Sequence, residues 1–259
     1  DDSGACVGCS DANDPDAACT ALDPNSPVCD EATNTCVQCL PDAAAACTGD
    51  TPICDEATST CVGCAWHEQC QDACRMKTGA CFDGDPLVAA TPVELQQAID
   101  DIAALNPPQG VVLLQDSATL GSVTVPAGVR VAILGEPDQA IPEWQGANGS
   151  PALTLEAGAE VYIQGLRIAG TQAALGIVVS GELWLDRSMV VNNAGGGLLV
   201  DGGAAVVRNS FVGGNNTGVV AIDIDGGSAD ISFTTAYSAL TLGTPAIALR
   251  CAARDIVNV

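Results

Sequence analysis

The sequence has little positive charge. It contains 8 lysine and arginine residues against 32 aspartates and glutamates, a single histidine, and a formal net charge of −24. An electrostatic field of this sign repels nucleic acids and anionic membranes, so we expect neither as a partner. A solvated acidic surface explains this composition, with cation binding as the alternative.

Aromatic residues are also scarce, at 3% of the chain, and no apolar run approaches the length of a membrane span. The 47% hydrophobic composition therefore comes mainly from small and β-branched residues, which suit an all-β interior better than a helical core. The sequence has no initiator methionine and no signal peptide, so we interpret it as a mature, processed form.

Cysteine, in contrast, is abundant: 13 of the 14 cysteines precede Phe82. This density predicts an oxidising compartment and a secreted or cell-surface protein. The motifs CVGC, CVQC and CVGC recur, and each repeat closes on two cysteines separated by six residues. The repeats define three quartets: Cys9, Cys19, Cys29 and Cys36; Cys39, Cys47, Cys54 and Cys61; Cys64, Cys70, Cys74 and Cys81.

The four cysteines of each quartet could form two disulfides or bind a zinc ion. Zinc ribbons use two Cys-x-x-Cys pairs, but here further cysteines lie between the pairs and His67 is the only histidine. We therefore predict two disulfides per module, because modules this small bury too little apolar surface to fold unaided. Three pairings stay open, and first with third plus second with fourth is a working assumption. Cys6 and Cys251 lie outside the quartets, and the sequence does not decide whether they pair.

An acidic loop in the first module, SDANDPDAAC, carries Asp11, Asn13, Asp14 and Asp16. Alternating oxygen donors are typical of a calcium loop, but the bidentate glutamate and the turn glycine of such loops are missing. We favour solvated acids, keep calcium as the possible alternative, and expect no other cofactor.

The composition changes from Cys-rich to apolar between Asp83 and Pro92. We place disulfide-rich repeats over residues 1–85 and a second domain over 86–259. A threonine N-cap, a proline at the first helical position and a glutamate that closes a capping box predict a helix over about 91–105. Its apolar residues recur at helical spacing, so we expect it to cap the first coil of a β-stack.

One pattern occurs three times within residues 158–212, as GAEVYIQGLRIAG, SGELWLDRSMVVNN and GGAAVVRNSFVGGN. Superposition places Ile163, Leu185 and Val207 in one column at a period of 22 residues. Short alternating apolar runs with Gly and Asn corners at this period predict stacked β-coils. We expect these asparagines at the corners, where they tolerate left-handed backbone conformations: Asn192, Asn193, Asn209, Asn215 and Asn216.

Residues 136–150 break this period and are rich in Pro, Gly and Asn, which predicts a lateral loop. Loops on a rigid scaffold often bind ligands. Trp144 is the candidate exposed aromatic in this loop, although it could equally fold back over the apolar coil surface.

The runs VELxxAI, GVVLL, LxLxAGAxVxIxGLRI and VRNSFVxGN resemble the right-handed parallel β-helix proteins of the pectin lyase-like group. The CDEATNTCVQC modules resemble the Cys-rich repeats that precede such domains in secreted proteins of myxobacteria and their relatives. These resemblances imply a mainly β fold: a right-handed parallel β-helix with one short N-terminal capping helix, preceded by small disulfide-rich modules. They imply no particular activity, because that fold hosts lyases, hydrolases, adhesins and proteins of no known activity.

Enzymes of the resembled group would need a basic residue beside calcium-binding carboxylates, or convergent Asp and Glu residues. The predicted β-helix region contains neither lysine nor histidine, and the polygalacturonase-type motifs Asn-Thr-Asp, Gly-His-Gly and Arg-Ile-Lys are absent. Its paired aspartates, Asp100 and Asp101, fall in the predicted capping helix and not in a coil. We therefore expect no catalytic residues. Asp186 and Arg208 align across adjacent coils, which predicts a ladder ion pair.

The best carboxylate group is formed by Asp223 and Asp225 on one strand face, with Asp201 and Asp230 in neighbouring coils. Together with Trp144, Asp201, Asp223 and Asp225 make a possible ligand face. This face motivates one alternative function, a carbohydrate-binding or polysaccharide-degrading β-helix protein.

The leading expectation is a secreted, non-catalytic structural protein of an extracellular or cell-surface assembly. The coil pattern continues to RDIVNV at the end of the sequence, with no helix, proline or charge run after it, which predicts an uncapped C-terminal coil. An exposed strand edge can accept another chain, so subunits could join head to tail into a fibre. The alternative is that the sequence is a fragment, with further coils and their cap removed.

Overall fold

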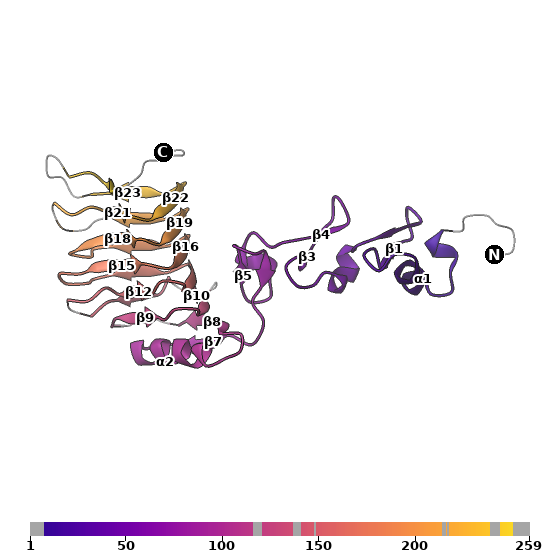
Figure 1. Cartoon of the computed structure of the whole chain (residues 1–259), viewed down its shortest axis with the longest axis horizontal. Helices are drawn as coiled ribbons and strands as arrows, with labels where there is room; N and C mark the ends of the chain where they lie inside the picture. Colours follow the sequence, from indigo (N-terminus) through magenta and orange to yellow (C-terminus); the bar gives the residue numbers. More distant parts are fainter. Residues whose placement is uncertain are drawn as a thin grey trace. The chain divides into compact units, whose positions relative to one another are not determined.

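The computed structural model describes residues 8–115, 121–136, 141–147, 149–213, 216, 218–238 and 244–250. The chain divides into two compact units, Asp1–Asp83 and Gly84–Val259. Figure 1 labels their helices and strands along the chain. Cys6, Asn215, Cys251 and the terminal RDIVNV segment lie outside the described residues, as does the side chain of Asp11.

The first unit repeats one plan three times, a short helical segment followed by an antiparallel hairpin. The helical segments are η1 (Cys9–Asp11) and α1 (Pro15–Leu22), then η2 (Pro41–Ala46), then η3 (His67–Gln69). The hairpins are β1 (Val28–Asp30) with β2 (Thr35–Val37), β3 (Ile53–Asp55) with β4 (Thr60–Val62), and β5 (Cys74–Arg75) with β6 (Ala80–Cys81). The repeat seen in the cysteine spacing is therefore a repeat of structure.

Hydrogen bonds inside the first two hairpins tie the strands to their turns. Thr33 Oγ1 donates to Asp30 Oδ2 over 2.6 Å, and Thr58 Oγ1 donates to Asp55 Oδ2 over 2.7 Å. These hydroxyl contacts are the main reason that the pKa values of Asp30 and Asp55 lie below the ordinary aspartate value. Both turns therefore contain an ionised carboxylate as a fixed acceptor at neutral pH.

Each of the three modules contains two disulfides, six in total. In each quartet the first cysteine pairs with the third and the second with the fourth, which was the working assumption from the sequence. The pairs are Cys9–Cys29, Cys19–Cys36, Cys39–Cys54, Cys47–Cys61, Cys64–Cys74 and Cys70–Cys81. In the first module the buried apolar cluster consists of cysteines alone, so the cross-links are themselves the core.

The second unit is a right-handed parallel β-solenoid, as the sequence predicted, with one sheet on each of three sides (Figure 1). The seven-stranded sheet contains β7 (Leu87–Ala89), β8 (Gln109–Leu114), β10 (Arg130–Gly135), β13 (Glu160–Gln164), β16 (Glu182–Asp186), β19 (Ala204–Arg208) and β22 (Ser228–Ser232). The five-stranded sheet contains β11 (Glu143–Gln145), β14 (Arg167–Ala169), β17 (Met189–Val191), β20 (Phe211–Gly213) and β23 (Thr235–Tyr237). The six-stranded sheet contains β9 (Val123–Val125), β12 (Leu153–Leu155), β15 (Leu175–Val179), β18 (Gly196–Asp201), β21 (Ile222–Asp225) and β24 (Ile247–Arg250).

The strand register confirms the repeat found in the sequence. Ile163 lies opposite Leu185, Leu185 opposite Val207, and Val207 opposite Ile231 in adjacent parallel strands. The apolar column therefore continues one coil beyond the three aligned segments.

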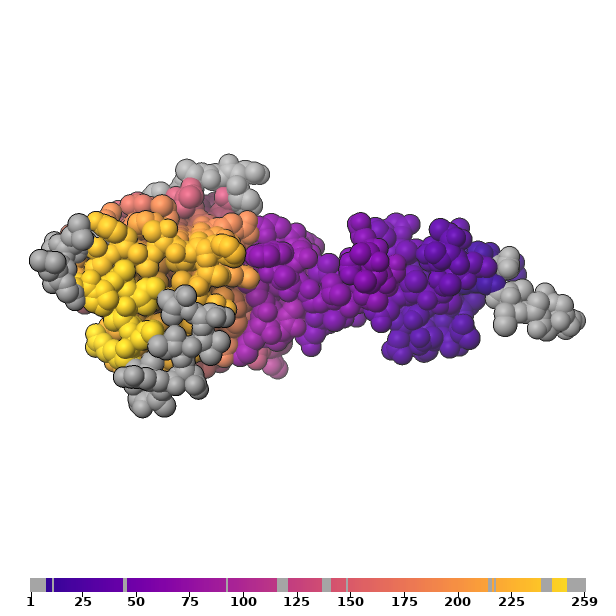
Figure 2. All heavy atoms as spheres, turned by 90° about the horizontal axis from the view of Figure 1, so that it is seen from above, coloured from indigo at the N-terminus to yellow at the C-terminus, as the bar shows by residue number. Residues whose placement is uncertain are grey.

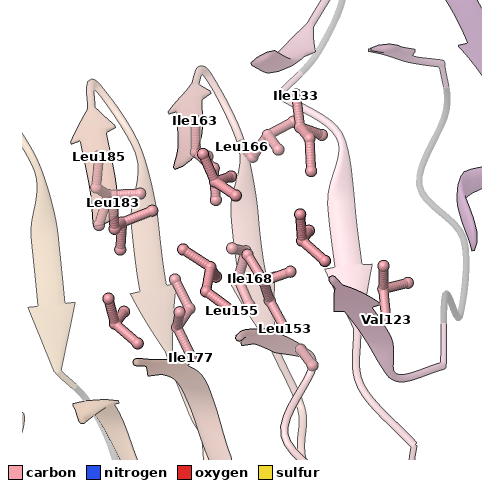
Figure 3. Packing of buried hydrophobic residues seen from close by; sticks show 14 of the residues in the cluster. Val123, Ile133, Leu153, Leu155, Ile163, Leu166, Ile168, Ile177, Leu183 and Leu185 are labelled. Atoms are coloured by element: carbon pink, nitrogen blue, oxygen red, sulfur yellow. The ribbon is translucent and has the colours of Figure 1, made fainter. Parts of the chain in front are cut away.

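The core lies between the three sheets and consists of alternate residues of each strand. Figure 3 shows side chains such as Ile133, Ile163 and Leu185 pointing into this space, where Leu155 and Ile168 meet them from the other two sheets. The named side chains are at most 1% exposed to solvent. Burial of each such side chain is worth about 1.5–3 kcal/mol, so this column of aliphatic residues is the main source of stability.

Helix α2 (Pro92–Ala103) begins where the sequence predicted. Thr91 is its N-cap and accepts a hydrogen bond from the Glu94 N–H, while Glu94 Oε2 accepts one from the Ala90 N–H over 2.9 Å. The Ala90 contact is the largest of the hydrogen bonds that hold the pKa of Glu94 below its ordinary value. The Thr91 contact is the half of the capping box that the sequence predicted, whereas Glu94 binds the N–H one residue before the N-cap.

Helix α2 closes the N-terminal end of the solenoid. Its apolar face, including Leu95, Ile99 and Ile102, is buried in the same cluster as the coil interior. The Gln96 side chain accepts from the Thr124 N–H over 3.0 Å and donates to the Thr124 carbonyl over 3.2 Å. A single amide therefore makes both of the hydrogen bonds that a neighbouring strand would offer to β9 at this position.

Hydroxyl groups form a ladder at the corner between the seven-stranded and five-stranded sheets. Ser188 Oγ accepts from the Leu166 N–H, Ser210 Oγ from the Ser188 N–H, and Thr234 Oγ1 from the Ser210 N–H. Each hydroxyl also donates to a carbonyl of its own coil. The corner backbone is thus hydrogen-bonded from coil to coil without a strand.

A glycine column marks the opposite corner, where the chain enters the seven-stranded sheet. A Cβ atom at Gly203 would collide with the carbonyl oxygen of Gly181, and one at Gly227 would collide with the carbonyl oxygen of Gly203. The coils can approach this closely only because these positions have no side chain.

Candidate functional site

The carboxylates of the predicted ligand face come from adjacent strands of the six-stranded sheet. Asp201 ends β18 and lies opposite Asp225, which ends β21. Strand alternation buries Ile222 and Ile224 and turns Asp223 and Asp225 away from the core. The structure therefore brings these three aspartates to one surface, as the sequence suggested.

Asp223 is the most enclosed of the three, with 16% of its side chain exposed. Its Oδ2 accepts a 2.6 Å hydrogen bond from Arg250 Nη2, and its buried Oδ1 has no hydrogen-bond partner among the described residues. Asp201 and Asp225 are exposed to solvent. The face thus combines one ion pair with two solvated carboxylates.

This geometry offers poor support for acid catalysis. A carboxylic acid that donates a proton at neutral pH needs an environment that keeps it neutral, such as apolar burial. Asp223 instead faces a guanidinium, and Asp201 and Asp225 face water. Asp230, expected beside them, lies in β22 of the seven-stranded sheet and is therefore not part of this face.

Trp144 is not part of the ligand face, and the prediction of an exposed aromatic was wrong. Its side chain is 0% exposed and belongs to the solenoid core, and its indole N–H donates to the Gly121 carbonyl over 3.1 Å. The predicted lateral loop over 136–150 contains strand β11, which pairs with β14 and directs Trp144 beside the inward-facing Ile168. An indole that completes the core is unavailable for stacking against a ligand.

The acids of the candidate calcium loop have structural roles. Asp14 Oδ1 caps α1 by accepting from the Ala17 N–H over 3.1 Å. Asp16 Oδ1 accepts from the Cys29 N–H over 2.8 Å and so ties the helix to the hairpin. Asn13 lies on the surface beside them.

A hollow of ≈ 480 Å³ lies beside these two acids. Five of the residues that line it are acidic: Asp14, Asp16, Asp30, Glu31 and Asp42. Among the described residues, the metal-ligating atoms that converge within 4.8 Å belong to cysteines, all of which are in disulfides. The acids are gathered around the hollow without forming a compact cation site.

A polar network surrounds Asp186 at the edge of the seven-stranded sheet. Arg208 lies opposite Asp186 in the strand register, as expected, and Asp186 forms an ion pair with Arg187, over 3.1 Å. Asn209 Nδ2 donates to the other carboxylate oxygen over 2.9 Å, and Arg187 Nη2 donates to Gln164 Oε1. Both carboxylate oxygens of Asp186 therefore accept hydrogen bonds from neighbouring side chains of the solenoid.

The corner asparagines behave as predicted where the structure describes them. Asn192 and Asn209 have φ angles of 55° and 49°. Asn193 is fully buried, and its Oδ1 accepts from both the N–H and the hydroxyl of Thr171. The side-chain amides of Asn193 and Asn209 join consecutive coils.

A second hollow, of ≈ 720 Å³, opens at this corner and was not anticipated. Its lining carries amide and hydroxyl groups but no charged or aromatic side chain: Gly170, Thr171, Gln172, Ala173, Asn192, Ala194 and Asn216. The predicted clustering of asparagines at corners was the signal that could have located it.

An aromatic pair was also missed. Tyr162 and Trp184 stack with ring centroids 4.7 Å apart, at the paired positions of β13 and β16. The Tyr162 hydroxyl donates to Glu160 Oε1 over 2.7 Å. The same 22-residue alignment that superposed the apolar columns places these two rings in one column, so the sequence contained the signal.

Residues 1–87 match the model of a family of unknown function, DUF8331. The match covers the disulfide modules. No curated protein and no solved structure matches the chain. The first unit is therefore similar in sequence to a family for which no activity is described.

Proposed function

We propose that this protein is a secreted, non-catalytic structural component of an extracellular or cell-surface assembly. Six disulfides support an oxidising compartment. Among the described residues, no helix has the length and apolarity required to cross a bilayer. Polar side chains in the solenoid columns, such as Ser188, Asn193 and Asp186, are committed to coil-to-coil hydrogen bonds.

The observation that carries this proposal is the difference between the two ends of the solenoid. At the first coil, α2 covers the end of the solenoid, and the inward-facing residues Val112 and Val125 are fully buried. At the last described coil, Ile247 lies opposite the buried Ile222, and Leu249 lies opposite the buried Ile224. Yet Ile247 is partly exposed and Leu249 is 45% exposed.

This exposed coil contains the last described strand of each of the three sheets. Within the described residues, β22, β23 and β24 are the outermost strands, and Figure 2 shows this end of the solenoid in yellow. An apolar surface flanked by strand edges favours association with another β-rich surface. In the proposed head-to-tail assembly, this coil would bind the disulfide modules of the next subunit.

Association through this coil predicts that charge at its apolar positions disrupts the oligomer. We expect the double substitution Ile247→Lys and Leu249→Lys to weaken self-association by at least about tenfold, because both side chains lose their apolar contacts. Light scattering across a concentration series measures this effect. The control is Ile141→Lys before β11, where the side chain is already 53% exposed. A parent protein that stays monomeric at high concentration, or equal weakening by both variants, contradicts the proposal.

A second candidate function is binding of a neutral or cationic glycan. The corner hollow is lined by amides and a hydroxyl, and the adjacent sheet presents Asp201 and Asp225 to solvent. Substitution of Asp223 and Asp225 together by alanine is expected to abolish retention on a polysaccharide panel if the aspartate face binds glycans. Unchanged retention or no retention by the parent protein removes this candidate, and Asp230→Ala in the other sheet is the matched control.

A further inference from the structure

The chain contains three aspartyl–prolyl bonds, Asp14–Pro15, Asp23–Pro24 and Asp85–Pro86. We propose that Asp85–Pro86 is a built-in scission site at which acid separates the disulfide modules from the solenoid. The bond lies just past the boundary between the two units, which falls between Asp83 and Gly84. Cleavage there would cut neither the three disulfide modules nor any strand of the solenoid.

The chemistry needs only the aspartyl side chain and water. The protonated carboxyl of Asp85 attacks its own main-chain carbonyl carbon, and a C–O bond forms as the C–N bond to Pro86 breaks. The carboxyl proton passes to the departing proline nitrogen, which leaves as a secondary amine. Water then opens the resulting five-membered cyclic anhydride, giving a new C-terminal Asp85 and a new N-terminal Pro86. Intramolecular attack of this kind benefits from the high effective concentration of the neighbouring group.

The other two aspartates are held in place by their local structure. Asp14 is the N-cap of α1, so its Oδ1 accepts from the Ala17 N–H and its carbonyl accepts from the Ala18 N–H. Attack at this carbonyl would require the first turn of the helix to open.

Asp23 is held more tightly. Its Oδ1 accepts from the Asn25 N–H over 3.0 Å, its Oδ2 accepts from the Ser26 hydroxyl over 3.1 Å, and its carbonyl accepts from the Ser26 N–H. The Asn25 N–H contact is the largest of the effects that lower the pKa of this carboxyl. Asp23 therefore reaches the reactive protonated form only at a lower pH than an ordinary aspartate.

Asp85 has none of these restraints. It is exposed, it lies outside every helix and strand, and the described residues offer its carboxylate no hydrogen bond or ion pair. The preceding Gly84 is exposed at φ 103°, and β7 begins only at Leu87. Asp83 is the nearest other ionisable residue in the sequence.

The test is incubation of the folded, disulfide-intact protein between pH 5 and pH 2.5, followed by intact-mass spectrometry over time. We expect fragments 1–85 and 86–259, with a rate that rises as the pH falls through the range near 4 where aspartyl carboxyls protonate. Cleavage at Asp85–Pro86 should exceed cleavage at the other two bonds by at least about tenfold. Asp85→Asn and Pro86→Ala should each suppress these fragments, whereas Asp83→Asn should leave their rate unchanged.

A second measurement separates structure from local sequence. After reduction and denaturation, all three aspartyl–prolyl bonds should cleave at similar rates, because the restraints on Asp14 and Asp23 are gone. The proposal is overturned if the folded protein cuts the three bonds equally, if Asp85→Asn still releases fragment 86–259, or if the preference for Asp85–Pro86 persists in the denatured chain. Circular dichroism at each pH establishes that the solenoid remains folded during the comparison.

Discussion

Complete reduction with dithiothreitol is expected to unfold residues 9–81 while the solenoid stays folded. The six disulfides close segments of 10 to 20 residues, and a loop of this size is worth about 3 kcal/mol per disulfide. Modules of about 25 residues bury too little apolar surface to replace that contribution, and in the first module the buried cluster is made of cysteines. The measurement is hydrogen exchange with peptide-resolved mass spectrometry, before and after reduction.

The solenoid is the internal control for this experiment. Within residues 84–250 the described part of the chain contains no disulfide, and its core is aliphatic. Exchange rates in β13, β16 and β19 should therefore be the same in both samples. Continued protection of the three hairpins after quantitative alkylation would show that apolar burial and hairpin hydrogen bonds suffice to fold the modules.

Gly203→Ala is expected to destabilise the solenoid by about 2–3 kcal/mol, because its Cβ would be forced against a backbone oxygen that cannot move aside. The obstructing atom is the Gly181 carbonyl oxygen, which also accepts the 2.9 Å hydrogen bond from the Ala204 N–H. Relief of the collision requires the two coils to separate at this corner, and that movement stretches the hydrogen bond. Chemical denaturation monitored by circular dichroism gives the free energy of unfolding.

The adjacent Gly202 supplies the matched control. A Cβ there meets no atom within 4 Å, but the residue has φ 69°. Gly202→Ala should therefore cost only about 1 kcal/mol, the penalty for a left-handed backbone without a steric collision. Equal losses for the two variants would mean that backbone conformation, not the spacing between coils, sets the requirement for glycine at this corner.

The solenoid was predictable because its columns repeat. Val161, Ile163 and their equivalents alternate with outward residues, and a one-residue slip would turn every one of them away from the core. The register could therefore be read from the sequence. The disulfide pairing could not, since all three pairings of a quartet satisfy the spacing and only the folded hairpin selects one.

Trp144 marks where sequence reasoning failed. Strand β11 has three residues, of which one points inward, so it carries no detectable alternation. Its neighbours include Pro142 and Gly146, which favour a loop in any local analysis. β11 forms a strand because it pairs with β14, and a local sequence pattern cannot predict that contact.

The Asp186 network shows a similar limit at the level of side chains. The backbone register of Asp186 and Arg208 followed from the repeat, but Arg187 sits at a corner with φ 46°. Arg187 reaches Asp186 and Gln164 from this corner. Periodicity predicts which residues share a column, but it does not predict the contacts that Arg187 makes from the corner.

The hydroxyl ladder at Ser188, Ser210 and Thr234 has an evolutionary consequence. Ser188 and Ser210 each accept a hydrogen bond from the coil before and donate their own N–H to the coil after, so the two surfaces of a coil are complementary. A duplicated or deleted coil would meet the same partners on both sides. Unequal recombination within the gene can thus lengthen or shorten the solenoid one coil at a time, and descendants of this sequence can differ in length while every junction between coils is preserved.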